Sequence, residues 1–174
     1  MPDSSAPQQF LNEVREGLGR GGATDGALQA VLDKVLARYD CTTGTIHALD
    51  PATGLLRLRA QRGIPGHLLE RVERVPIGKG MAGIAAERRQ PVQVCNLQTD
   101  HSGVARPAAK ETRMEGSIAV PMLVGDSLRG VLGVAKPVPY EFTEAETGAL
   151  VEIAAAIGDR LGGEGSPGPA RRTP

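Results

Sequence analysis

Hydrophobic residues recur at helical spacing near both ends of the chain. Three segments share this pattern, in which every third or fourth residue is apolar: 10–18, 28–39 and 143–161. At the start of the last segment, Thr143 and Glu146 have the spacing of a capping box, in which the two residues satisfy free N–H groups of the first turn. Amphipathic helices of this kind need an apolar surface to cover, and we expect the middle of the chain to supply it.

The middle of the chain alternates between apolar and polar residues with a period of two, which is typical of strands. Five segments show the alternation: 45–49, 55–61, 91–95, 117–124 and 127–136. Residues 50–54 and the pair Gly125-Asp126 have the composition of tight turns and join four of the strands into two hairpins. The pattern therefore predicts an α+β domain built on one antiparallel sheet.

Two inserted segments, 63–90 and 96–116, separate the hairpins from the middle strand. The first predicts short helices over 67–72 and 81–88, and the second has no clear period apart from one helical turn over 108–112. Long irregular segments inside compact domains are often functional. We expect the terminal helices to cover one face of the sheet and the inserted segments to cover the other.

Composition narrows the range of functions. The 174 residues carry no net charge and contain only two Phe, two Tyr and no Trp. Nucleic-acid binding favours a basic surface and aromatic stacking platforms, so no nucleic-acid partner is expected. Cys41 and Cys95 lack the spacing of a zinc or redox motif. Without an apolar run that could span a membrane or a signal-peptide pattern, the sequence predicts no membrane association and a cytoplasmic location.

The domain organisation follows from these patterns. We expect an N-terminal tail with a short helix over residues 1–23 and one domain over 24–161. Residues 162–174 are rich in Gly, Pro and Arg and predict a disordered tail.

Several stretches of the domain resemble the GAF domain family. They are 75–85, 90–94, 116–122 with 130–134, and 140–146. In this order they are similar to the loop-into-helix segment, the middle strand, the last hairpin and the start of the final helix of that family. The resemblance covers roughly residues 24–161. It implies a GAF-like (profilin-like) antiparallel sheet, with terminal helices on one face and inserted segments forming a pocket on the other.

The resemblance also implies a function. GAF domains are sensory modules of signalling proteins that hold a small molecule between the sheet and the inserted segments, and they often dimerise through their terminal helices. The chain is therefore expected to be a small-molecule-binding sensor that signals to a partner protein or to an output domain. The apolar stripes of 28–39 and 150–161 are wider than one sheet face needs, which predicts a homodimer.

Two better-defined branches of the family match this chain only in part. The free methionine-(R)-sulfoxide reductases carry cysteines in the loop-into-helix segment and in the long loop; here Ala82 stands at the first position and residues 97–115 contain no Cys. The cyclic-nucleotide branch carries an Asn-Lys pair, a Phe and an Asp-Glu pair, of which Lys136, Phe142 and Glu146 remain. We expect Lys136 and Glu146 to form an ion pair that joins the last strand to the final helix.

A candidate ligand site lies where the inserted segments meet the sheet. Gly80 begins a helix whose free N–H groups favour an anion, and Arg113 adds a positive charge, so we expect a small anionic or carboxylate-bearing ligand. The candidate residues are Gly80, Met81, Cys95, His101, Arg113, Met114, Ser117 and Ile118. No metal-binding spacing is present and the sequence names no cofactor. A dimerisation module with an empty pocket and a reductase-like enzyme stay open as alternatives.

Overall fold

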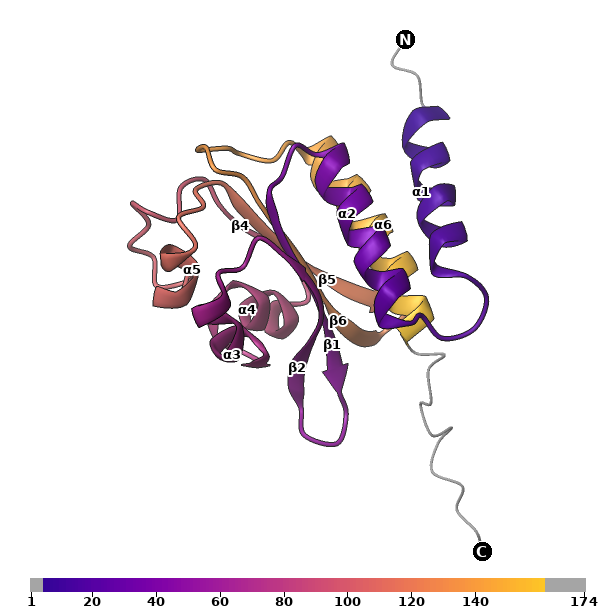
Figure 1. Cartoon of the computed structure of the whole chain (residues 1–174), viewed down its shortest axis with the longest axis horizontal. Coiled ribbons are helices and arrows are strands. Elements are labelled where there is room, and N and C mark those ends of the chain that lie inside the picture. The colour runs from indigo at the N-terminus through magenta and orange to yellow at the C-terminus, as the bar shows by residue number, and fades with distance from the viewer. Residues whose placement is uncertain (1–4, 162–174) are drawn as a thin grey trace, which may run out of the picture.

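A six-stranded antiparallel sheet forms the centre of the computed structural model, which describes residues 5–161 (Figure 1). Its spatial order is β3-β2-β1-β6-β5-β4, so β3 and β4 are the edges. The strands are β1 (Thr43–Asp50), β2 (Leu55–Arg62), β3 (Arg74–Pro76), β4 (Val92–Val94), β5 (Ser117–Val124) and β6 (Ser127–Ala135). The two predicted hairpins, β1–β2 and β5–β6, are confirmed and pair with each other through β1 and β6. The α+β class is confirmed as well.

The short edge strand β3 was not predicted from the sequence. It has three residues, and its pairing with β2 sets Val75 opposite Leu56. A three-residue segment shows too little alternation to be recognised locally, and here the neighbouring strand supplies the hydrogen bonds that define it.

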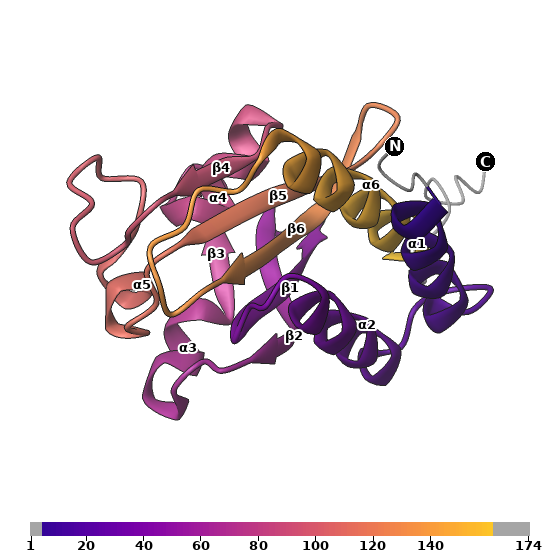
Figure 2. The ribbon, with the colours of Figure 1, turned by 90° about the horizontal axis from the view of Figure 1, so that it is seen from above.

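Three helices lie on one side of the sheet: α1 (Ser5–Leu18), α2 (Asp25–Arg38) and α6 (Glu144–Leu161) (Figures 1 and 2). α1 begins at Ser5, five residues before the predicted start, because Pro7 is tolerated in the first turn of a helix. The capping box of α6 is confirmed, since Glu146 N donates to Thr143 Oγ1 and Thr143 N donates to Glu146 Oε1. The tail predicted over 162–174 lies outside the described residues.

α1 packs on α2 and α6 rather than on the sheet (Figure 2). Its Leu11, Val14 and Leu18 are buried in the same core as the apolar faces of the other two helices. The apolar stripes of α2 and α6, whose width predicted a homodimer, are therefore covered in part by α1 of the same chain.

The opposite face is covered by the inserted segments, as expected (Figure 1). They form a 3₁₀ turn η1 (Gly66–Leu68), α3 (Leu69–Val72), α4 (Gly80–Arg88) and α5 (Pro107–Glu111). Ala85 and Ala86 of α4 pack on a second, smaller core that includes Leu56 and Val131 of the sheet. Because α4 contacts the sheet closely and α3 and α5 lie to one side of it, the inserted segments leave room above the strands.

The expected ion pair between Lys136 and Glu146 is replaced by an indirect link. Lys136, which is only 7% exposed, donates from Nζ to Tyr39 O at 2.5 Å and lies 4.1 Å from the centroid of the Tyr140 ring. Tyr140 Oη in turn donates to Glu146 Oε1 at 2.7 Å. The ring of Tyr140 thus occupies the position between the two charges, and the carboxylate is used by the capping box of α6.

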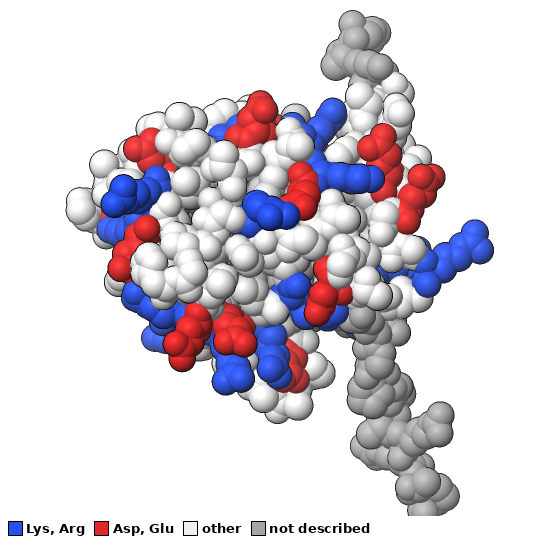
Figure 3. Space-filling view, in the orientation of Figure 1, with Lys and Arg blue, Asp and Glu red and all other residues white. Residues whose placement is uncertain are grey.

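Charges of both signs are interspersed on the face seen in Figure 3. Two ion pairs join α2 to β2: Arg62 with Asp33 at 2.9 Å and Arg59 with Asp25 at 2.6 Å. No helix within residues 5–161 combines the length and the apolar character needed to cross a membrane.

Candidate functional site

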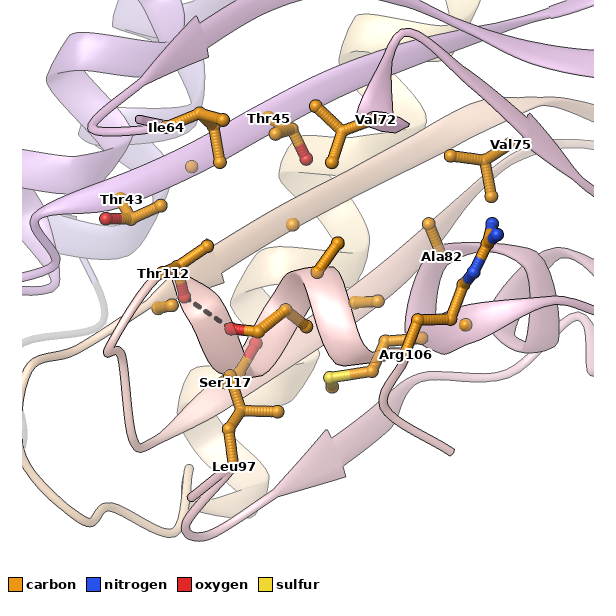
Figure 4. Close-up of a pocket in the computed structure, with 18 of the residues that line it drawn as sticks. Thr43, Thr45, Ile64, Val72, Val75, Ala82, Leu97, Arg106, Thr112 and Ser117 are labelled. Atoms are coloured by element: carbon orange, nitrogen blue, oxygen red, sulfur yellow. Dashed lines mark hydrogen bonds between the residues drawn. The ribbon is translucent and has the colours of Figure 1, made fainter. Parts of the chain in front are cut away.

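A cavity of about 370 Å³ lies between the sheet and the inserted segments α3, α4 and α5 (Figure 4). Its floor is the middle of the sheet. Along β1 successive side chains point to opposite faces, so Thr43, Thr45 and His47 line the cavity while Ile46 packs into the core under the terminal helices. β6 lies next to β1 and contributes Gly133, Val134 and Ala135, and Ser117 at the start of β5 completes the floor.

The walls of the cavity are mainly aliphatic, and its lining contains no Phe, Tyr or Trp. The larger apolar lining residues are Ile64, Val72, Val75, Met81, Leu97 and Val134. Hydroxyl groups from Thr43, Thr45, Thr112 and Ser117 supply polar but uncharged positions. Thr112 Oγ1 is already engaged, since it donates to Ala109 O (Figure 4). The cavity can therefore surround a small apolar body and offer it a few neutral hydrogen-bonding groups.

All three charged lining residues are basic and lie at the exposed mouth: Arg71, Lys79 and Arg106. Arg71 of α3 forms an ion pair with Glu111 of α5 at 2.5 Å, which spans the mouth. Within residues 5–161, the side chains of Lys79 and Arg106 have no ion pair or hydrogen bond, and no Asp or Glu lines the cavity. The mouth is therefore a region of uncompensated positive charge.

Gly80 brings these cations together at the start of α4. Its φ of +66° lies in the left-handed region, which favours glycine. The stem of Arg106 crosses over it, so that a Cβ atom on Gly80 would be 2.8 Å from Arg106 Cδ. Arg106 then extends toward Ala82 and Val75 (Figure 4). No side chain caps α4, and its first N–H groups add a partial positive charge next to the two cations.

His47 is a buried ionisable residue of the cavity lining, with 3% of its surface exposed. Its Nε2 lies 2.8 Å from Val72 O. A carbonyl can only accept, so Nε2 carries the proton and Nδ1 keeps a lone pair that has no partner. Burial lowers the pKa of His47 from its ordinary value, against the opposing effect of the bond to Val72. His47 is therefore a neutral imidazole that ties β1 to α3.

The structure brings four of the eight predicted site residues to the cavity and leaves four outside it. Gly80, Met81, Ser117 and Ile118 line it; the residues that do not are Cys95, His101, Arg113 and Met114. The reason is the path of the long loop. Its helix α5 faces the cavity, whereas residues 113–116 turn away and run along 136–138 through bonds such as Glu115 N to Lys136 O at 2.8 Å.

The individual positions agree with this path. Arg113 is exposed and has a left-handed φ of 62°, and His101 is exposed near the tip of the loop. Met114 packs outside the cavity and its sulfur accepts a hydrogen bond from Thr42 Oγ1. Cys95 is exposed just beyond β4.

Sequence reasoning missed Lys79, Arg106 and His47. Lys79 directly precedes Gly80, so its position next to the predicted helix start was readable from the sequence. Arg106 precedes Pro107, and a Pro at the first helical position is a start signal that could have located α5 and the residue before it. His47 lies two residues after Thr45 in the predicted strand, so the sequence indicates that both share one face of the sheet. It does not indicate which segment covers that face.

Neither cysteine lies in the cavity. Cys41 belongs to the core under the terminal helices, where burial raises the pKa of its thiol to about 11. Residues 5–161 hold no group of three His, Cys, Asp or Glu side chains that could bind a metal ion.

The domain thus has helices on one face of an antiparallel sheet and, on the other face, a cavity of the size of small-molecule sites. Comparison with known families specifies it further. The model of the GAF domain family matches residues 23–161, and the chain belongs to this family. No curated protein matches the chain.

Solved structures agree with the family assignment at the level of the fold. The chain is similar to the GAF domain of a phosphoenolpyruvate-protein phosphotransferase from Coxiella burnetii, with 18% identity, a TM-score of 0.76, and coverage of 91% of this chain and 94% of that one. The corresponding Acinetobacter domain gives 20% identity, a TM-score of 0.75, and coverage of 92% and 94%. A free methionine-R-sulfoxide reductase from Neisseria meningitidis, solved with its substrate, is also similar to the chain. Its sequence identity is 17%, its TM-score is 0.74, and the match covers 90% of this chain and 89% of that one.

Proposed function

We propose that this GAF domain is a sensor that binds a small anionic molecule in the cavity and passes the binding signal to a partner protein or an output domain. The observation that carries the proposal is the cavity itself. It joins aliphatic walls to a mouth at which Lys79 and Arg106 have no partner within residues 5–161. Unpaired cations beside a helix N-terminus favour an anionic group.

The effect of ligand binding can also reach the protein surface through α5. α5 contributes Ala108, Ala109 and Thr112 to the cavity, and it is held to α3 and α4 by the Arg71–Glu111 ion pair and by the contact of Arg106 with Gly80. A ligand that engages Arg106 changes the same contacts that hold α5. The position of α5 is therefore the element that we expect to report occupancy to a partner.

Native mass spectrometry of freshly purified protein, followed by release and identification of any bound molecule, tests the proposal. Arg106→Gln is expected to lose the bound molecule, whereas Arg113→Gln and Arg88→Gln, which change exposed charges outside the cavity lining, are expected to retain it. A bound molecule whose retention does not depend on Arg106 would contradict this placement.

We infer a binding role rather than a catalytic one. The solved reductases show that this fold can carry an enzyme, but a thiol nucleophile must reach its substrate, and Cys41 and Cys95 both lie outside the cavity lining. The purified protein with a thiol reductant is therefore expected not to reduce free methionine sulfoxide. Turnover that is abolished by Cys95→Ser would overturn this inference.

The homodimer stays a prediction, and α1 changes where it would form. Because α1 covers the edges of α2 and α6, a dimer through the terminal helices would use the outer surface of α1 or the exposed part of α6 near Val151. Light scattering of the full chain at high micromolar concentration tests it, and a monomer at that concentration would contradict it.

A further inference from the structure

We propose that the ligand of the cavity is an aliphatic monocarboxylate, with its carboxylate at the mouth and an uncharged hydrocarbon body inside. This inference rests on the proposed function and names the chemical class that the site selects. It follows from where charge is found in the cavity, from where it is missing, and from the kind of side chain that forms the walls.

Positive charge is confined to one end of the cavity. Lys79 and Arg106 lie on either side of the Gly80 backbone, the first as its neighbour in the chain and the second by crossing over it. Glu111, an acidic residue beside the mouth, is occupied by Arg71. A carboxylate at this end would accept charge-assisted hydrogen bonds from both cations and meet the first N–H groups of α4.

The interior of the cavity has no charged side chain that could pair with a second anionic group of the ligand. Ile64, Val72, Val75 and Leu97 form the walls, and none of the described lining residues beyond the mouth is charged. His47, the one ionisable group of the wall, is neutral and already bonded to Val72 O. A second carboxylate or a phosphate placed there would be buried without a counter-charge, which is strongly unfavourable. The cavity therefore discriminates against dicarboxylates.

The walls also discriminate against flat aromatic ligands. No Phe, Tyr or Trp lines the cavity, and the one aromatic ring of the lining, the imidazole of His47, is only 3% exposed, so a nucleobase or an aromatic acid would find no open ring face to stack on. The volume of about 370 Å³ is near the lower end of the ~300–1,000 Å³ range of small-molecule sites. A flexible alkyl chain can adapt to branched aliphatic walls by rotation about its own bonds. The hydroxyls of Thr45 and Ser117 are positions at which an uncharged hydroxyl or oxo group on that chain could form a hydrogen bond.

Isothermal titration calorimetry with three matched probes tests the class. Octanoate has one carboxylate, octanamide has the same chain without the charge, and suberate adds a second carboxylate at the far end. We expect octanoate to bind at least about tenfold more tightly than octanamide, the ratio that one added charge-assisted hydrogen bond provides. Suberate is expected to bind more weakly than octanoate. Hexanoate and decanoate would then define the preferred chain length.

Variants localise the effect. Arg106→Gln and Lys79→Gln are each expected to bring the octanoate-to-octanamide ratio toward one while octanamide affinity changes little. Arg113→Gln removes the same charge outside the cavity lining and should leave the ratio unchanged. Ala109→Phe, which fills the cavity from α5, should abolish binding of both probes; circular dichroism and the melting temperature establish that this variant is folded.

The outcomes separate this inference from the proposed function. Equal affinities for octanoate and octanamide, tighter binding of suberate or of a cyclic nucleotide than of octanoate, or octanoate binding that survives Ala109→Phe would each overturn the monocarboxylate class. If a different molecule is found bound in an Arg106-dependent way, the sensor function stands and only the class is wrong. If neither the probes nor any co-purifying molecule binds, both proposals fail.

Discussion

The side chain of Arg106 crosses the backbone of Gly80 so closely that the two positions act as one contact between α5 and the start of α4. A Cβ atom on Gly80 would lie 2.8 Å from Arg106 Cδ and 3.0 Å from its Cγ. The glycine is therefore needed twice, once for its positive φ and once for the space that the arginine stem occupies.

Replacing Gly80 with Ala is expected to loosen α5 as well as to strain the backbone. A non-glycine residue at positive φ costs about 1–2 kcal/mol, and the added methyl group also displaces Arg106. Gly103→Ala is the matched control, because Gly103 has a φ of 82° but nothing within 4 Å of an added Cβ. Urea denaturation should show a loss of stability in both variants. Hydrogen exchange of residues 96–116 should rise only in Gly80→Ala; equal exchange in the two variants would contradict the contact.

The Arg71–Glu111 ion pair is expected to control access to the cavity more than it stabilises the fold. Its side chains are half exposed, at 50% and 47%, and exposed pairs contribute only about 0–1 kcal/mol. Arg71→Gln should therefore change the free energy of unfolding by less than about 1 kcal/mol while it speeds exchange of α5 amide protons and ligand dissociation. Arg62→Gln, which breaks an exposed pair with Asp33 outside the cavity lining, should leave both rates unchanged. A similar acceleration in both variants would rule out a specific role for the pair.

Stability is expected to fall in mild acid because of His47. Burial holds the pKa of His47 below its ordinary value, so the unfolded chain binds a proton at a higher pH than the folded chain does. Folding stability is therefore complete above about pH 6.5 and decreases below it, by at most about 1.4 kcal/mol per pH unit.

Urea unfolding between about pH 7.5 and about pH 5.5 measures this slope, in a range above the usual titration of carboxylates. His47→Gln should flatten it, since an amide can still donate to Val72 O without titrating. His67→Gln, at an exposed position, should retain it. An unchanged slope in His47→Gln would assign the acid sensitivity to other groups.

The buried charge of Lys136 is expected to be stabilising through Tyr39 and Tyr140 rather than through Glu146. Lys136→Met keeps the apolar stem but loses the charged hydrogen bond to Tyr39 O and the contact with the Tyr140 ring, which predicts a loss of about 1–3 kcal/mol. Lys34→Met on the exposed side of α2 should change little. A double-mutant cycle of Lys136→Met with Glu146→Gln, measured by thermal melting, should give a small coupling energy. A large coupling energy would instead indicate a direct ion pair between Lys136 and Glu146.

Local pattern determined most of the elements of this protein. The alternation over 117–124 and the turn at Gly125-Asp126 place the β5–β6 hairpin, because a half-buried strand repeats every two residues. The capping box of Thr143 and Glu146 likewise marks the start of α6. The family was recognised from the order of the elements together with stretches such as 75–85 and 140–146 that resemble GAF domains.

The site depended on more than local pattern. Gly80 and Ser117 could be placed at the cavity from the sequence because a helix start and a strand start keep their place in the fold. The long loop has no such period, so nothing local showed that it would turn Arg106 toward the cavity and Arg113 away from it. β3 was missed for a related reason, since its three residues become a strand only through pairing with β2.

The sequence by itself thus determined which segments are helices and strands and which face of each is apolar, because those properties repeat within a few residues. Only the tertiary structure decided which cations meet at the cavity mouth, that His47 bonds to Val72 O, and that Tyr140 stands between Lys136 and Glu146. Each of these depends on residues brought together from separate elements, and their directions follow from packing rather than from the order of residues in the chain.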